Sequence, residues 1–215
     1  MSERYLVVLD VDSTLIENEV IELLAAEAGS LDDVASITDR AMRGELDFAQ
    51  SLRERVATLA GLPDTVFADV RQRITVTQGV PRLIAGVKAA GGHVGVVSGG
   101  FHEVLDPLAE TLALDFWRAN RLEVDQNGRL TGRVLGPIVD ASAKASALLE
   151  WATATATPIE RTVAIGDGAN DLRMMAEAGL SIAFNAKPIV REQADVALDE
   201  RDLGRVLGLL GLEQG

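Results

Sequence analysis

The chain begins with an apolar run that ends in two acids. Residues 5–14 read YLVVLDVDST, so that Asp10 and Asp12 follow directly on the apolar stretch. A short run of this kind predicts a strand buried in a sheet. An ionised carboxylate is costly to remove from water unless a cation or hydrogen bonds compensate for the lost hydration. The chain must therefore fold so that some other group offsets Asp10 and Asp12.

Strand-like and helical segments alternate in the second part of the chain. Besides residues 5–10, the predicted strands are 93–97, 162–168, 180–184 and 195–198, and residues 121–134 form a hairpin around an Asn–Gly turn. This alternation predicts an α/β fold, with a doubly wound, Rossmann-like parallel sheet covered by helices on both faces. We expect residues 1–15 and 75–215 to form this core domain.

Residues 16–74 differ from the rest, because their pattern is helical and acidic and contains no strand-like run. Glycines at positions 29, 44 and 61 divide the segment into three or four short helices. In open α/β sheets, ligands bind outside the carboxyl ends of the strands. We therefore expect residues 16–74 to be an inserted helical cap domain that covers this edge.

Three predicted strands end in polar residues, with the sequences DVDST, SGG and GDGAND. If the first and last of these strands are neighbours, Asp10, Asp12, Asp167 and Asp171 gather at one edge, where their repulsion requires a cation. Aspartate also caps turns and helices, but that explanation is weak for four acids at two strand ends. Carboxylates without histidine or cysteine favour Mg²⁺ as the ion.

Two acids at a strand-to-loop bend can reach one site from two sides. One of Asp10 and Asp12 could ligate the metal and attack, while the other transfers protons. A carboxylate nucleophile suits phosphoryl transfer through an aspartyl-phosphate.

Groups that could bind the phosphoryl oxygens lie further along the chain. Ser98 offers a hydroxyl, and Gly99 and Gly100 offer unobstructed backbone N–H groups. Lys144 stands among small residues in ASAKASA and could neutralise phosphate charge. The other two lysines, Lys88 and Lys187, are expected on the surface.

Composition excludes several functional classes. The net charge of −13 and the pI of about 4.6 argue against a nucleic-acid partner. The chain has no cysteine, and His93 and His102 lack zinc-binding spacing. There is no visible leader and no apolar run of about 18 residues, so we expect a cytoplasmic protein without a membrane partner. The sequence does not indicate the oligomeric state.

The motifs DVDST, VSGGF, the lone Lys144 and GDGAND, in this order, resemble those of the haloacid dehalogenase-like hydrolases. Within that superfamily the chain is similar over its whole length to the phosphoserine phosphatases, also in ENE, MRGELDFAQSLRERV, ANRLEV and GRLTG. The resemblance implies Mg²⁺-dependent hydrolysis of L-phosphoserine to L-serine and phosphate through an aspartyl-phosphate, a step of serine biosynthesis.

The resemblance also implies roles for the acids. Asp10 would be the nucleophile and a metal ligand, and Asp167 would be a further ligand. Asp12 would be the general acid and base, with its backbone carbonyl also touching the metal. Asp171 would orient the water molecules bound to the metal.

Further roles follow from the same resemblance. Ser98, Gly99 and Lys144 would bind the phosphoryl oxygens. In the cap, Glu19 would bind the substrate ammonium and Arg55 its carboxylate. The remaining substrate-binding residues are expected to be Gly100, Asn170, and Met42 and Phe48, which would shield the site from water.

The sequence is also compatible with other functions. A related enzyme could act on another small phosphomonoester, or could transfer the phosphoryl group to homoserine. A receiver-like signalling module also groups acids at strand ends, but it needs neither a second acid at Asp12 nor a cap. A dinucleotide-binding enzyme would need G-x-G-x-x-G after the first strand, which is absent from the sequence.

Overall fold

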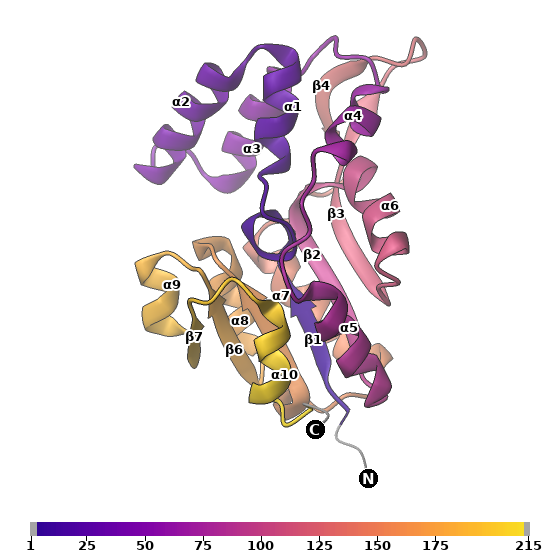
Figure 1. The fold of residues 1–215 in the computed structure, drawn as a ribbon. Helices are drawn as coiled ribbons and strands as arrows, with labels where there is room; N and C mark the ends of the chain where they lie inside the picture. The colour runs from indigo at the N-terminus through magenta and orange to yellow at the C-terminus, as the bar shows by residue number, and fades with distance from the viewer. Residues whose placement is uncertain (1–3, 213–215) are drawn as a thin grey trace.

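The computed structural model describes residues 4–212, which contain a seven-stranded sheet in the order β4-β3-β2-β1-β5-β6-β7 (Figure 1). Strand β4 is antiparallel to β3, and the other neighbours are parallel. The strands are β1 Leu6–Leu9, β2 His93–Phe101, β3 Phe116–Val124, β4 Leu130–Leu135, β5 Thr162–Gly166, β6 Leu180–Phe184 and β7 Val196–Leu198. The predicted α/β class and parallel sheet are confirmed.

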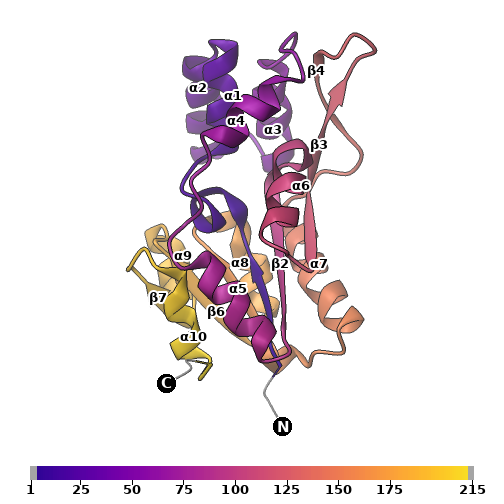
Figure 2. The same ribbon diagram turned by 45° about the vertical axis from the view of Figure 1, so that its right-hand side comes forward.

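Helices cover both faces of this sheet (Figure 2). They are α1 Val20–Ala28, α2 Leu31–Met42, α3 Phe48–Ala57, α4 Val66–Gln72, α5 Val80–Ala89, α6 His102–Thr111, α7 Ala141–Ala154, α8 Leu172–Glu177, α9 Pro188–Gln193 and α10 Val206–Leu209. A π-type turn, Val11–Leu15, follows β1. Short 3₁₀ turns comprise Ile159–Arg161, Ala169–Asp171 and Leu203–Arg205. No helix in residues 4–212 is long and apolar enough to span a membrane.

The hydrophobic core has two parts, one on each face of the sheet. Because side chains alternate along a strand, Val7 and Leu9 pack with α5, α6 and α10. Leu6 and Val8 face the other way and pack with α7 and α8. Strand β1 is therefore buried on both faces, as its apolar run predicts.

Two strands are longer than the sequence pattern indicates. Strand β2 continues through Ser98–Phe101, although the apolar run ends at Val97. Strand β3 begins at Phe116, whereas we expected a strand only from residue 121. The stretch FWRAN mixes apolar and polar residues without a preceding turn signal, and it becomes a strand because it pairs with β2.

Helices α1 to α4 lie at one end of the molecule, beyond the carboxyl ends of the strands (Figure 1). The chain segments that lead into and out of these helices pair with each other, through the bridge between Ile16 and Val76 and the hydrogen bond from Thr77 N to Leu15 O. This short paired link joins the helical segment to the sheet.

The β3–β4 hairpin reaches up to the same helices. Leu130 N donates to Leu62 O, and Gly61 N donates to Leu130 O. At the hairpin tip, Asp64 N donates to Gly128 O, and Gly128 has the positive φ of +72° that a tight turn requires. The hairpin therefore supports the helical segment, a role that its sequence does not reveal.

Candidate active site

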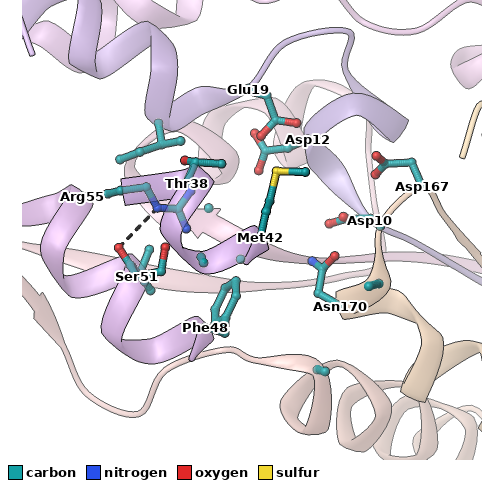
Figure 3. A pocket seen from close by; sticks show the side chains of 18 of the residues that line it. Asp10, Asp12, Glu19, Thr38, Met42, Phe48, Ser51, Arg55, Asp167 and Asn170 are labelled. Carbon is teal, nitrogen blue, oxygen red and sulfur yellow. Dashed lines mark hydrogen bonds between the residues drawn. The ribbon is translucent and has the colours of Figure 1, made fainter. Parts of the chain in front are cut away.

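A cavity of about 490 Å³ lies between the carboxyl ends of the central strands and helices α2 and α3 (Figure 3). Ten of the thirteen residues proposed from the sequence line it: Asp10, Asp12, Glu19, Met42, Phe48, Arg55, Gly99, Gly100, Asp167 and Asn170. The other three, Ser98, Lys144 and Asp171, are buried. The parallel strands bring Asp10, Gly99 and Asp167 together at one edge of the sheet, and the helical segment adds residues from the other side.

The two acids after β1 separate because the chain turns sharply behind Asp10. Val11 N donates to Asp10 Oδ1 at 2.7 Å, and Ser13 takes a left-handed φ of 56° within the turn. Asp12 consequently points toward the helical segment, where its Oδ1 accepts from Val20 N at 2.8 Å. Its Oδ2 accepts from Ser98 Oγ at 3.3 Å. The two carboxylates therefore face one cavity from different sides.

Lys144 offsets part of the buried negative charge. It lies in the first turns of α7, which Asp140 caps by accepting from Ala143 N. Its Nζ lies 2.6 Å from Asp10 Oδ1 and 2.7 Å from Asp171 Oδ1. Burial disfavours the ammonium, but the charges of Asp10 and Asp171 outweigh that effect and raise the pKa of Lys144. Lys144 is therefore a fixed cation at the floor of the cavity.

One lysine does not balance all the acids. Ligand atoms of Asp10, Asp167 and Asp171 lie within 4.8 Å of one another. Burial is the main cause, and the charge of Asp171 the second, of a pKa of Asp10 well above its usual range. The positive charge of Lys144 opposes this rise without cancelling it. Burial and the charge of Asp171 raise the pKa of Asp167 to about 6. This set of carboxylate oxygens fits a hard divalent cation, which would remove the repulsion.

The neighbours of Asp12 affect its protonation. Burial and the nearby charge of Glu19 raise the pKa of Asp12 to about 7. Glu19 is held in place by Ser13, whose Oγ donates to Glu19 Oε1 at 2.6 Å. Among the described residues, the Asp12 carboxylate lies outside the acidic group around Asp10. A carboxyl with a pKa near neutrality is suited to proton transfer.

The end of β2 presents its backbone to the cavity. A Cβ on Gly99 would lie 2.8 Å from the Phe48 ring, and one on Gly100 would lie 2.9 Å from Asp12 Oδ2. Gly100 N donates to Ser98 Oγ at 2.8 Å. The two glycines therefore place no side chain between this backbone and the cavity. The Gly100 N–H holds the buried Ser98 hydroxyl beside Asp12, and backbone N–H groups at such a strand end are suited to binding an anion.

The helical side of the cavity carries a separate cation. Arg55 extends from α3 into the cavity, and its Nε donates to Ser51 O at 3.3 Å (Figure 3). Burial lowers the pKa of Arg55, while the charges of Glu19 and Asp12 oppose that shift. Met42 is 72% exposed at the cavity wall. Its role in shielding the site stays a prediction.

Among the lining residues that the sequence did not point to, three have polar side chains: Thr38, Ser51 and Lys187. Lys187 was expected on the surface; it is exposed, yet it also lines the cavity. Its backbone N donates to Asp167 O at 3.1 Å, and its charge opposes the rise in the pKa of Asp167. The available signal was its place after β6, a fourth strand end at the same edge.

Comparison with known proteins agrees with this geometry. The profile of the haloacid dehalogenase-like hydrolases matches residues 7–176. A phosphoserine phosphatase of Streptococcus thermophilus is 52% identical over 211 residues, which cover 98% of both chains. One of Mycobacterium tuberculosis is 55% identical over 99% of this chain but 52% of its own length. The chain thus spans about half the length of the first relatives it matches.

Solved structures show the same fold. A phospho-aspartyl intermediate analogue of a phosphoserine phosphatase superposes with a TM-score of 0.89 at 44% identity, covering 96% of this chain and 99% of the other. A substrate-bound phosphoserine phosphatase complex gives a TM-score of 0.91 at 44% identity, covering 97% and 99%. The chain therefore belongs to the haloacid dehalogenase-like hydrolase family, in which it groups with the phosphoserine phosphatases.

Proposed function

We propose that this protein hydrolyses L-phosphoserine to L-serine and inorganic phosphate, with Asp10 as the nucleophile and Mg²⁺ as the cation. The observation that carries the proposal is the division of one cavity into two charged ends. Asp10 and Lys144 lie at the sheet end, 2.6 Å apart, and Arg55 and Glu19 lie at the helical end. The names of the relatives support the same substrate.

The sheet end would bind the phosphoryl group. Lys144, Ser98 Oγ and the Gly99 N–H would donate to its oxygens. The Gly100 N–H, which donates to Ser98 Oγ, would hold that hydroxyl in place. Asp10, Asp167 and the backbone carbonyl of Asp12 would hold Mg²⁺, with Asp171 orienting the bound water. The bound ion would supply positive charge that neutralises the phosphoryl oxygens.

Two displacements at phosphorus complete the reaction. First, an Asp10 oxygen forms a bond to phosphorus, the bond from phosphorus to the serine oxygen breaks, and Asp12 gives that oxygen its proton. Next, the Asp12 carboxylate takes a proton from water, the water oxygen bonds to phosphorus, and the bond to Asp10 breaks. Phosphate leaves, and Asp12 is protonated again. A pKa of about 7 keeps both forms of Asp12 accessible at neutral pH.

The helical end would recognise the amino acid. A guanidinium forms paired hydrogen bonds with a carboxylate, so Arg55 would bind the substrate carboxylate. Glu19 would bind the ammonium. We propose that residues 16–74 act as the cap domain that carries this selection, with Met42 and Phe48 shielding the site and Asn170 contributing from the sheet edge.

Phosphate release from a small panel tests the proposal. The panel contains L-phosphoserine, phosphothreonine, phosphoethanolamine, a sugar phosphate and an aryl phosphate, each with Mg²⁺ and with EDTA. We expect release that needs Mg²⁺ and strongly favours L-phosphoserine. Equal rates on all compounds would remove Arg55 and Glu19 as selectors. No release unless homoserine is added would identify a phosphotransferase instead.

A further inference from the structure

We propose that Asn120 is a positioning residue that fixes the geometry of the phosphate-binding segment; this inference rests on the proposed function. Asn120 lies on β3 and is 1% exposed. Its Nδ2 donates to Gly99 O at 2.8 Å, and its Oδ1 accepts from Val139 N at 2.8 Å. Only one orientation of the amide satisfies both partners, because a flip would place Asn120 Oδ1 against the Gly99 carbonyl oxygen and Nδ2 against the Val139 N–H.

Asn120 acts where the pairing of the sheet is interrupted. Val97 on β2 pairs with Arg118 on β3, and the next matched pair is Phe101 with Asn120. Between these two pairs the chain advances four residues along β2 but only two along β3. Residues Ser98–Gly100 therefore form a β-bulge that has no matched partners on β3. The ladder does not hold this stretch, and the Asn120 side chain supplies a hydrogen bond to it instead.

That hydrogen bond determines where the next N–H group points. The Gly99 carbonyl and the Gly100 N–H belong to one planar peptide unit and point in opposite directions. With the carbonyl held by Asn120, Gly100 N is directed at Ser98 Oγ, 2.8 Å away on the side of Asp12. Two adjacent glycines would otherwise allow this unit to rotate.

The other half of the Asn120 amide reaches the helix that carries Lys144. Val139 precedes Asp140, whose side chain accepts from Ala143 N at 2.9 Å and whose carbonyl accepts from Lys144 N at 2.9 Å. One buried side chain therefore ties the β2 segment to the start of α7. These two elements supply the donors proposed for the phosphoryl group, and Asn120 sets their relative position without touching the substrate.

The test compares the binding of inorganic phosphate with stability. Asn120→Ala removes both hydrogen bonds, and Asn120→Ser is a milder change whose single, shorter hydroxyl cannot span both partners. Thr162→Val is the matched control, because Thr162 is also buried and its Oγ1 makes two hydrogen bonds. Thr162 is the first residue of β5, so it lies at the end of that strand away from the cavity. Calorimetry in the presence of Mg²⁺ measures the affinity for inorganic phosphate. Assays of phosphate release measure how strongly L-serine inhibits, and thermal unfolding measures Tm.

We expect the Asn120 variants to bind inorganic phosphate about tenfold more weakly, because buried polar groups lose their hydrogen-bond partner. Inhibition by L-serine should be unchanged. Thr162→Val should lower Tm similarly and leave phosphate affinity unchanged. Unchanged phosphate affinity in the Asn120 variants, or equal weakening in Thr162→Val, would overturn the inference. If the wild type did not hydrolyse phosphoserine but Asn120→Ala still lost phosphate affinity selectively, the proposed function would fail and the positioning role would stand.

Discussion

At the scale of single residues, the site is a cluster of buried charges that do not cancel. Asp10 and Asp171 both contact Lys144, and Asp167 adds a third carboxylate to the same group. Buried ion pairs lose much of their attraction to desolvation, but removing one partner leaves an uncompensated charge. We therefore expect the ammonium of Lys144 to contribute to stability as well as to the proposed chemistry.

Replacing Lys144 with methionine should destabilise the metal-free protein by about 3 kcal/mol, because Asp10 and Asp171 lose their shared cation. Urea unfolding in EDTA measures this change. Lys88→Met is the control, since Lys88 pairs with Asp115 near the surface and should cost less than about 1 kcal/mol. An equal loss of unfolding free energy in the two variants would show that the buried ion pairs of Lys144 stabilise the protein no more than the surface pair of Lys88.

At the scale of elements, helix α3 carries the proposed selectivity. Arg55 extends from its last turn toward Glu19 and Asp12, which lie near the start of α1 and the end of β1. The cavity thus places the guanidinium of α3 close to one acid at the start of α1 and another in the turn after β1. In the proposed function, phosphoryl transfer and amino-acid recognition therefore depend on different elements, and we expect mutations to change one without the other.

Arg55→Ala should raise the KM for L-phosphoserine by about 10- to 100-fold, as expected for the loss of a charged hydrogen bond. The KM for an aryl phosphate, which has no carboxylate, should change little. Steady-state phosphate release with both substrates gives the comparison, and Arg53→Ala on the exposed face of α3 is the control. Equal effects on both substrates would mean that Arg55 does not bind a carboxylate.

At the scale of the whole molecule, the positions of the apolar strands along the chain were predictable, and their exact extent was not. Buried parallel strands have to be apolar, so β1, β5 and β6 stand out in the sequence, and their carboxyl ends bring Asp10 and Asp167 together. The first half of β3 lacks that signal. The same holds for Asn120, because nothing in a lone asparagine indicates that it will bond to Gly99, 21 positions away.

The acids of the site also link stability to pH. The pKa of Asp12 is about 7 and that of Asp167 about 6 in the folded protein, against about 3.9 in an unfolded chain. The fold favours their protonated forms, so the metal-free protein loses stability as pH rises from about 4 to about 7. A divalent cation would reverse this loss once the acids are ionised.

Mg²⁺ should therefore raise Tm more at about pH 7.5 than at about pH 5, because protons compete with the ion for the carboxylates at the lower pH. Thermal unfolding with and without Mg²⁺ at both pH values provides the measurement. In Asp167→Asn the Mg²⁺ effect should shrink at both. A Tm shift independent of pH would argue against an ion bound by these carboxylates.

The proposed mechanism requires that Asp10 accepts the phosphoryl group. Rapid acid quench during turnover of L-phosphoserine, followed by mass spectrometry of peptides, locates any phosphoryl group on the enzyme. We predict that it is found on the peptide that contains Asp10, and that Asp10→Asn folds but shows neither the modified peptide nor turnover. Near wild-type phosphate release by Asp10→Asn, or a phosphoryl group on another residue, would contradict the mechanism.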